Sequence, residues 1–223
     1  MALQYEHISL KRVVVEANLW PPVEEIPHGT LSRLFGLVNE DEIFSACELR
    51  ASGASFRGEY WTYDIDGSTV RIRCFGYRDR PTLYARIRKL LDETRSIAPS
   101  RRVAFYTQEV RVFADVPEGG KRDVGDVVQK KLLRSVKLED RESLPGLDGA
   151  GLSLVGSTDE YAWHADLDPA DDDFLSLFAG ISFYREPEPP RPGSDLDAIE
   201  EQVKVACGFV EGALKDFSAK FFT

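Results

Sequence analysis

The sequence predicts an α+β fold made of two βαβββα-like halves with antiparallel sheets. The main observation is that aromatic-rich strands precede an amphipathic helix twice along the chain. The first set of strands lies within 60–75 and is followed by a helix that ends at Ile97. The second set lies within 161–184 and is followed by a long C-terminal amphipathic helix starting near Leu196. We interpret this repeated order as an internal duplication.

The two halves are expected to divide the chain into residues 1–99 and 100–223. Pro99 ends the helix of the first half, because proline lacks the N–H group that a continuing helix needs. The second half includes the segment 186–193, in which four prolines predict a stiff linker before the C-terminal helix.

The first half begins with a predicted strand at 12–20, where β-branched residues are frequent and two prolines follow. Thr30 is expected to cap a helix that continues to Val38, because its side chain can accept a hydrogen bond from a free N–H group. Strands at 44–49 and 55–65 are predicted next.

Alternating apolar and polar residues predict a hairpin closed by Asp66-Gly67, where glycine supplies a positive φ. On the strands of this hairpin the inward side chains are Trp61, Tyr63, Ile65, Val70, Ile72 and Cys74, whereas Arg71 and Arg73 point outward. Pro81 opens the following helix, whose apolar side consists of Leu83, Ile87, Leu90, Leu91, Thr94 and Ile97.

In the second half, strand-forming residues predict strands at 103–113, 152–155, 161–167 and 175–184, and apolar spacing predicts a helix near 124–134. The C-terminal helix is the best-specified element. Its apolar residues advance by three or four positions throughout: Leu196, Ile199, Val203, Ala206, Val210, Ala213, Phe217 and Phe221.

Composition limits the class of protein. Hydrophobic residues make up 43% of the 223 residues, which is enough for a packed core and argues against extended disorder. No apolar run approaches the roughly 20 residues of a membrane span, and no export signal is recognised, so no membrane association is expected. The cysteines Cys47, Cys74 and Cys207 are scattered without a CxxC pair, which favours the cytoplasm.

Charge is unevenly distributed along the chain. The net charge is −10, yet residues 71–102 carry ten basic and three acidic residues, a local charge of +7. The segment 156–201 carries 13 acidic residues and only two basic ones. The overall acidity opposes a general affinity for nucleic acid, but the basic segment gives the protein a local patch of the opposite sign.

The basic segment is the strongest functional signal in the sequence. Arginine dominates it, and a guanidinium group binds carboxylates and phosphates in a bidentate manner. Three explanations are open: a solvated surface, contact with an acidic protein or with the 156–201 segment of a second copy in a homodimer, and contact with nucleic acid. The predicted partner-binding residues are Arg71, Arg73, Arg78, Arg80, Arg86, Arg88 and Lys89.

Catalytic signals are few. His164, Asp166 and Asp168 alternate along a predicted strand and therefore share one face, which suits a divalent metal and a metal-dependent hydrolase. The opposing interpretation is a strand with an ordinary polar face, since no second histidine lies nearby in the sequence. No nucleophile elbow, phosphate-binding loop or dinucleotide fingerprint is present, so neither a catalytic residue nor a cofactor is predicted.

The order of short motifs resembles a sporadically distributed bacterial family of about 250 residues that has no established activity. The motifs are Val15-Glu16 followed by Pro21-Pro22, the aromatic strand into Asp66-Gly67, the helix at Tyr84, the strand 102–106 and the ending Phe221-Phe222-Thr223. The resemblance spans nearly the whole chain and implies a shared fold, but no reaction.

Together these observations predict a non-enzymatic bacterial accessory protein of the cytoplasm that acts through protein–protein interaction. Its arginine-rich surface of strand and helix would dock an acidic partner, with charge chiefly setting the rate and specificity of association. The alternatives are a nucleic-acid-binding regulator that uses the same arginines, and a metal-dependent hydrolase at His164, Asp166 and Asp168.

Overall fold

A computed structural model describes residues 9–23, 25–76, 79–98, 104–117, 152–169, 176–185 and 194–217. In the first half the elements are β1 (Ser9–Trp20), α1 (His28–Val38), β2 (Ala46–Leu49), β3 (Gly53–Arg57), β4 (Trp61–Asp66), β5 (Thr69–Phe75) and α2 (Arg80–Ile97). In the second half they are β6 (Ala104–Pro117), β7 (Leu152–Ser157), β8 (Ala162–Pro169), β9 (Ser176–Tyr184), α5 (Asp195–Phe209) and the π-helical turn η2 (Val210–Leu214). The α+β fold class is confirmed.

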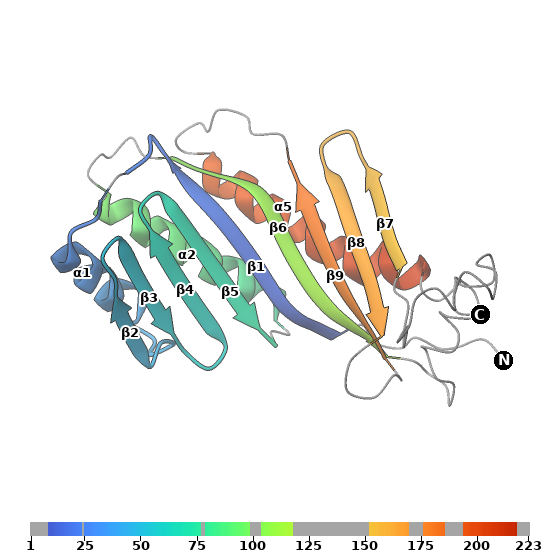
Figure 1. Cartoon of the computed structure of the whole chain (residues 1–223), viewed down its shortest axis with the longest axis horizontal. Helices are drawn as coiled ribbons and strands as arrows, with labels where there is room; N and C mark the ends of the chain where they lie inside the picture. The colour runs from blue at the N-terminus through green and yellow to red at the C-terminus, as the bar shows by residue number, and fades with distance from the viewer. Residues whose placement is uncertain are drawn as a thin grey trace, which may run out of the picture.

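All nine of these strands form one antiparallel sheet in the order β2-β3-β4-β5-β1-β6-β9-β8-β7 (Figure 1). Apart from the edge strand β2, which has no counterpart among the described strands, the order is symmetric about the centre, where β1 and β6 pair as the two longest of these strands. On either side of them, β5 corresponds to β9, β4 to β8 and β3 to β7. This symmetry is the arrangement expected of two joined halves, and the division at residue 99 stays a prediction.

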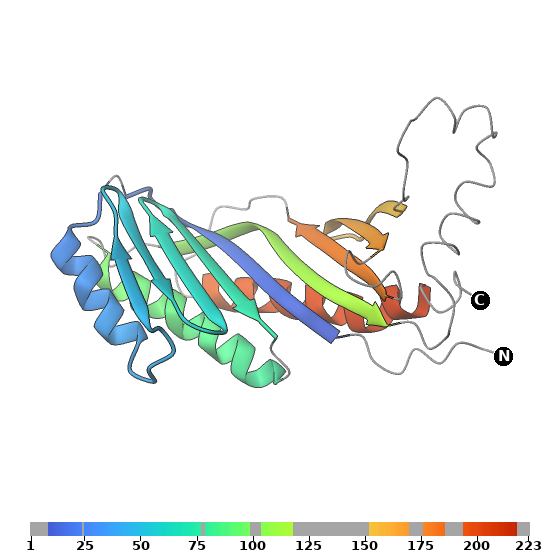
Figure 2. The ribbon, with the colours of Figure 1, turned by 60° about the horizontal axis from the view of Figure 1, so that its bottom comes forward.

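The helices α1, α2 and α5 all lie on one side of the sheet, and α2 contacts both of the others (Figure 2). One hydrophobic cluster between the sheet and the helices includes side chains from both halves. Its residues alternate along β4 and β5 and follow one side of α2, as the sequence predicts. In the described residues, the other face of the sheet carries no helix, and we call it the open face.

Thr94 explains how a polar residue fits the apolar side of α2. Its hydroxyl lies 2.5 Å from the phenol oxygen of Tyr63 and also donates to the carbonyl of Leu90. Tyr63 is fully buried, and burial raises the pKa of its phenol, so the group stays neutral as a hydrogen-bonding partner. The pair therefore satisfies both hydroxyls inside the core.

Several local predictions for the first half are wrong. The segment 55–65 is two strands rather than one, because the chain turns at Gly58, whose N–H donates to the carbonyl of Trp61. A Cβ atom at Gly58 would lie 1.9 Å from the carbonyl oxygen of Ile43, so this contact requires glycine. The helix α1 starts at His28 with Pro27 before it, which places Thr30 inside the first turn rather than at the cap.

The hairpin between β4 and β5 is confirmed, with a shift of its turn by one residue. Asp66 is the last paired residue of β4, opposite Thr69. Within this turn only Gly67 has a positive φ, of 50°. Because Asp66 is still paired, the turn is centred on 67–68 rather than on Asp66-Gly67.

The C-terminal helix changes character at Val210. An i→i+5 turn occupies 210–214, which places one more residue in that turn than an α-helix does. As a result Leu214 is buried and Ala213 is exposed, the reverse of the predicted pattern. Phe221, the predicted helix at 124–134 and the linker 186–193 lie outside the described residues.

Two bulges interrupt the pairing of β1 with β6, between Leu10 and Arg12 and between Glu16 and Asn18. The first one changes which face the side chains of β1 occupy. Leu10 is buried in the core, although Arg12, two residues later, lies on the open face between Phe75 and Phe113. A bulge thus aims Arg12 away from the core.

In the part of the chain that is described, no helix has the length and apolar character needed to cross a bilayer.

Candidate functional site: the open face of the sheet

The structure divides the seven predicted partner-binding residues between two sides of the molecule. Arg71 and Arg73 lie on the open face, where they alternate with the buried Val70, Ile72 and Cys74 of β5. The other four described residues, Arg80, Arg86, Arg88 and Lys89, belong to α2 in the helical layer. Arg78 lies outside the described residues. The expectation of one continuous cationic surface is therefore wrong, because the sheet separates the two sets.

On one side of α2, basic residues pair with the loop that joins α1 to β2. Arg86 donates to Asp41 at 2.5 Å, and Lys89 donates to Glu40 at 2.9 Å. The hydrogen bond from Arg86 is the main reason that the pKa of Asp41 is lowered. These contacts connect α2 to the α1 side of the helical layer.

On the other side, basic residues of α2 pair with the C-terminal helix. Arg80 contacts Glu211, and Arg88 contacts Asp197 at 2.5 Å and Glu200 at 3.3 Å. The acidic segment that the sequence suggested as a docking surface for a second copy thus meets α2 within the same chain. Both cation and carboxylate are already used, so these residues present little unpaired charge to a partner.

Asp195 forms the most buried of these pairs. Its carboxylate accepts from Arg95 at 2.5 Å and from the backbone N–H of Phe105 at 2.7 Å. The side chain of Asp195 is 1% exposed, and it is the first residue of α5. A carboxylate at this position also complements the positive end of the helix dipole. Asp195 therefore joins α5, α2 and β6 at one point.

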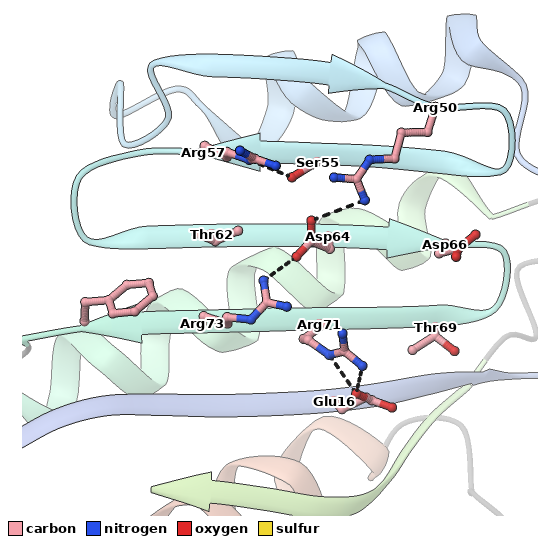
Figure 3. A pocket seen from close by; sticks show the side chains of 11 residues that line it. Glu16, Arg50, Ser55, Arg57, Thr62, Asp64, Asp66, Thr69, Arg71 and Arg73 are labelled. Atoms are coloured by element: carbon pink, nitrogen blue, oxygen red, sulfur yellow. Dashed lines mark hydrogen bonds and ion pairs between the residues drawn. The ribbon is translucent and has the colours of Figure 1, made fainter. Parts of the chain in front are cut away.

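The open face carries arginines and carboxylates that face each other across neighbouring strands (Figure 3). Arg71 donates through Nε and Nη2 to one oxygen of Glu16, at 2.7 and 2.5 Å. Arg73 donates to Asp64 at 2.5 Å, and Arg50 lies 4.0 Å from the same carboxylate. These side chains line a hollow of about 650 Å³ over β3, β4, β5 and β1.

The hollow has a mixed charge. Four arginines line it (Arg50, Arg57, Arg71 and Arg73) together with three carboxylates (Glu16, Asp64 and Asp66), which leaves a net charge of +1. Thr62, Thr69, Ser55 and the ring of Phe75 complete its lining. Such a surface offers hydrogen-bond donors and acceptors of both signs within a small area.

Four arginines near the open-face hollow and beside it were not predicted: Arg50 and Arg57, which line the hollow, and Arg12 and Arg111 on β1 and β6. Arg12 lies on β1 two residues before Val14. Val14 pairs with Arg73 on β5 and with Arg111 on β6, so the three arginines lie on adjacent strands. Val14 is 7% exposed although it is not part of the core cluster, so open-face side chains cover it. Alternation along β1 could have placed Arg12 on this face, but its neighbours on β5 and β6 depend on strand pairing.

Arg12 is the least compensated of these cations. Its guanidinium lies 3.9 Å from the centre of the Phe113 ring, and its Nε is buried without a hydrogen bond. Burial, followed by the nearby charges of Arg73 and Arg111, lowers the pKa of Arg12. Arg73 and Arg111 each have a carboxylate partner, Asp64 and Glu109. Among the described residues Arg12 has none.

The second half of the open face includes the residues of the hydrolase alternative. His164 Nε2 lies 3.1 Å from Asp166 and 2.6 Å from the hydroxyl of Ser153. Both contacts fall on the same nitrogen, whereas a catalytic triad needs the carboxylate on the other one. Over the described ranges, no group of three His, Cys, Asp or Glu side chains is placed to hold a metal ion. The hydrolase alternative gains no support here.

Two of the three cysteines are buried and unreactive. Cys74 and Cys207 are buried free thiols, as the sequence context of Cys74 suggests, whereas Cys47 is exposed. Burial raises the pKa of Cys74 to about 12 and that of Cys207 to about 11. Both thiols are therefore protonated at neutral pH and are poor nucleophiles.

Comparisons with known proteins do not identify the chain. It matches no family profile and no curated protein. Among solved structures it is similar to "Methanococcus jannaschii TBP", with 14% identity and a TM-score of 0.36 over 89% of this chain and 99% of that one. It is also similar to the di-domain ARO/CYC BexL from the BE-7585A biosynthetic pathway, with 14% identity, a TM-score of 0.27 and coverage of 94% and 97%. Likenesses of this size carry no argument about function.

Proposed function

We propose that this protein is a non-enzymatic binding protein that docks an acidic protein partner on the open face of its sheet. The carrying observation is that the described helices all cover one face of the sheet, and the other face presents Arg71 and Arg73 beside a hollow of about 650 Å³. Arg73 uses one guanidinium nitrogen for its hydrogen bond to Asp64. Since arginine has five N–H donors, it can bind a second carboxylate without giving up the first.

Mixed charge favours a protein over a nucleic acid as the partner. A phosphate backbone laid across the hollow would bring its negative charges against Glu16, Asp64 and Asp66. A protein segment can instead alternate carboxylates with polar or basic groups and so match both signs.

The expected bacterial, cytoplasmic setting belongs to the same proposal, since a reducing compartment suits three free cysteines.

Site-specific photo-crosslinking in the native host tests the proposal. A photoreactive amino acid replaces Thr62, which lines the hollow, or Asp92, which is exposed on α2 as a matched control position. We expect a nuclease-resistant protein adduct from position 62 only. The adduct is lost in Arg71→Glu/Arg73→Glu and retained in Arg86→Glu/Arg88→Glu.

The outcomes separate the alternatives. Nuclease-sensitive adducts at position 62 would replace the protein partner by a nucleic acid, and an adduct of twice the chain mass would identify a second copy as the partner. Equal labelling at both positions, or no labelling, would overturn the proposal. Thermal unfolding of each variant shows whether the charge reversals fold, and Arg71→Gln/Arg73→Gln serves as a milder pair.

A further inference from the structure

Within the docking face just proposed, we propose that Arg12, Arg73 and Arg111 form a binding site for one carboxylate group of the acidic partner. We call these three arginines, together with Phe75 and Phe113, the Arg12 cluster. This inference rests on the proposed function for the source of the carboxylate, but the site itself can be tested without any partner.

Strand pairing builds the cluster from three strands. Arg12 lies on β1 directly opposite Phe75 on β5 and Phe113 on β6. Two residues along β1, Val14 lies opposite Arg73 and Arg111. The three guanidinium groups therefore come from adjacent strands around one buried valine. Burial and the positive charges of Arg73 and Arg111 lower the pKa of Arg12.

The charge of the cluster fits a single negative group. Three arginines contribute +3, while Asp64 on Arg73 and Glu109 on Arg111 contribute −2, which leaves +1. That remaining charge resides on Arg12, because no described residue forms an ion pair or a hydrogen bond with it. One carboxylate would neutralise the cluster, whereas a phosphate dianion would leave an excess of negative charge beside Asp64 and Glu109.

The surroundings of Arg12 also prepare it for a planar ligand. The guanidinium is stacked on Phe113, 3.9 Å from the ring centre, which fixes its plane and reduces the rotamer freedom lost on binding. Its Nε is out of contact with water and lacks a hydrogen-bond partner. A carboxylate that accepts from the guanidinium would lower the repulsion by Arg73 and Arg111 and gain charge-assisted hydrogen bonds.

The test is an NMR titration of the full chain with sodium acetate, with sodium chloride at matched ionic strength as the reference. The reporter is the side-chain Nε–Hε signal of Arg12, assigned by its loss in Arg12→Lys. We expect a saturable shift with acetate that chloride does not reproduce. Arg111→Gln should weaken acetate binding severalfold, whereas Arg57→Gln, on the same face but outside the cluster, should leave it unchanged.

A linear shift that chloride reproduces, or equal weakening by Arg57→Gln, would overturn the site. Inorganic phosphate binding more tightly than acetate would overturn the assignment to a carboxylate. The result is independent of the crosslinking experiment. Acetate binding without a crosslinked protein would support the carboxylate site and overturn the proposed protein partner. A crosslinked protein without acetate binding would support the partner and overturn the carboxylate site.

Discussion

The arginines of α2 and the arginines of the open face differ in how they are paired. Arg80, Arg86 and Arg95 of α2 are only 17–21% exposed and bind carboxylates that other elements supply. Arg57 and Arg71 of the open face are 61% and 40% exposed, and their carboxylates lie on the neighbouring strand of the same face. Exposure alone does not separate the two sets, because Arg88 of α2 is 45% exposed and Arg73 of the open face is 29% exposed. The α2 set connects α2 to other elements of the helical layer, whereas the open-face set pairs within the sheet. Charge along the sequence does not reveal this difference, but the position of the partner does.

The largest effect is expected where the α2 set is most buried. Asp195→Asn removes the charge that Arg95 needs while the N–H of Phe105 loses a strong acceptor. Breaking a buried ion pair is strongly destabilising, and we expect a loss of about 3 kcal/mol in the free energy of unfolding. Denaturant unfolding measures it. The matched control Asp197→Asn, at an exposed carboxylate, should cost less than about 0.5 kcal/mol, and equal losses would contradict the assigned role of Asp195.

Two charge reversals with similar effects on stability, one in each set of arginines, test whether the two sets differ in function. Arg73→Glu and Arg88→Glu each remove an ion pair that is partly open to solvent and should each lower the free energy of unfolding by about 1 kcal/mol. Only Arg73→Glu should abolish crosslinking from position 62. If Arg88→Glu abolished it as well, the two sets would not be functionally distinct.

Double-mutant cycles compare the pairs themselves. Arg71 and Glu16 share two hydrogen bonds, and we expect a coupling of about 1 kcal/mol in the free energy of unfolding. Arg88 and Asp197 are more exposed, at 45% and 65%, and about 0.3 kcal/mol is expected. Urea unfolding of the single and double alanine variants gives both values. A larger coupling for Arg88 and Asp197 would reverse the ranking.

The smallest expected effect is the loss of stability at acidic pH. The pKa of Glu200 is lowered, mainly by the hydrogen bond from Lys204, and the pKa of Asp41 is lowered mainly by that from Arg86. A folded-state pKa below the unfolded value contributes stability that is present above the unfolded pKa. This contribution is lost as the pH falls from about 4.5, the ordinary value for Glu200, through the folded pKa. Thermal unfolding between pH 5 and pH 3 should show the fall, and Asp41→Asn should make it shallower.

Local patterns in the sequence predicted the elements of the fold well. Alternation fixes the inward faces of β4 and β5, and helical spacing fixes the buried side of α2, because both depend on neighbours along the chain. The break at Gly58 was missed because its cause is a contact with the carbonyl of Ile43, on another segment. The burial of Leu214 in place of Ala213 was not predicted, because a π-helical turn leaves no signal in the spacing of apolar residues.

The candidate site was less predictable for a related reason. Outward positions for Arg71 and Arg73 follow from alternation, but the carboxylates that pair with the α2 arginines are 45 to 131 residues away in the chain. Arg12 was missed because its neighbours Arg73 and Arg111 are set by two strand pairings between segments distant in the sequence. Residue type and spacing therefore show which side chains are cationic, and tertiary structure decides which of them remain unsatisfied.

The central pairing of β1 with β6 has a consequence for how the molecule could be divided. Arg12 and Arg73 come from the first half of the chain, whereas Arg111 and Phe113 come from the second. A ligand seated at this seam would be held by both halves of the chain together. Neither half expressed separately would keep a complete recognition surface, and a change in one half at the seam would have to be matched by a change in the other.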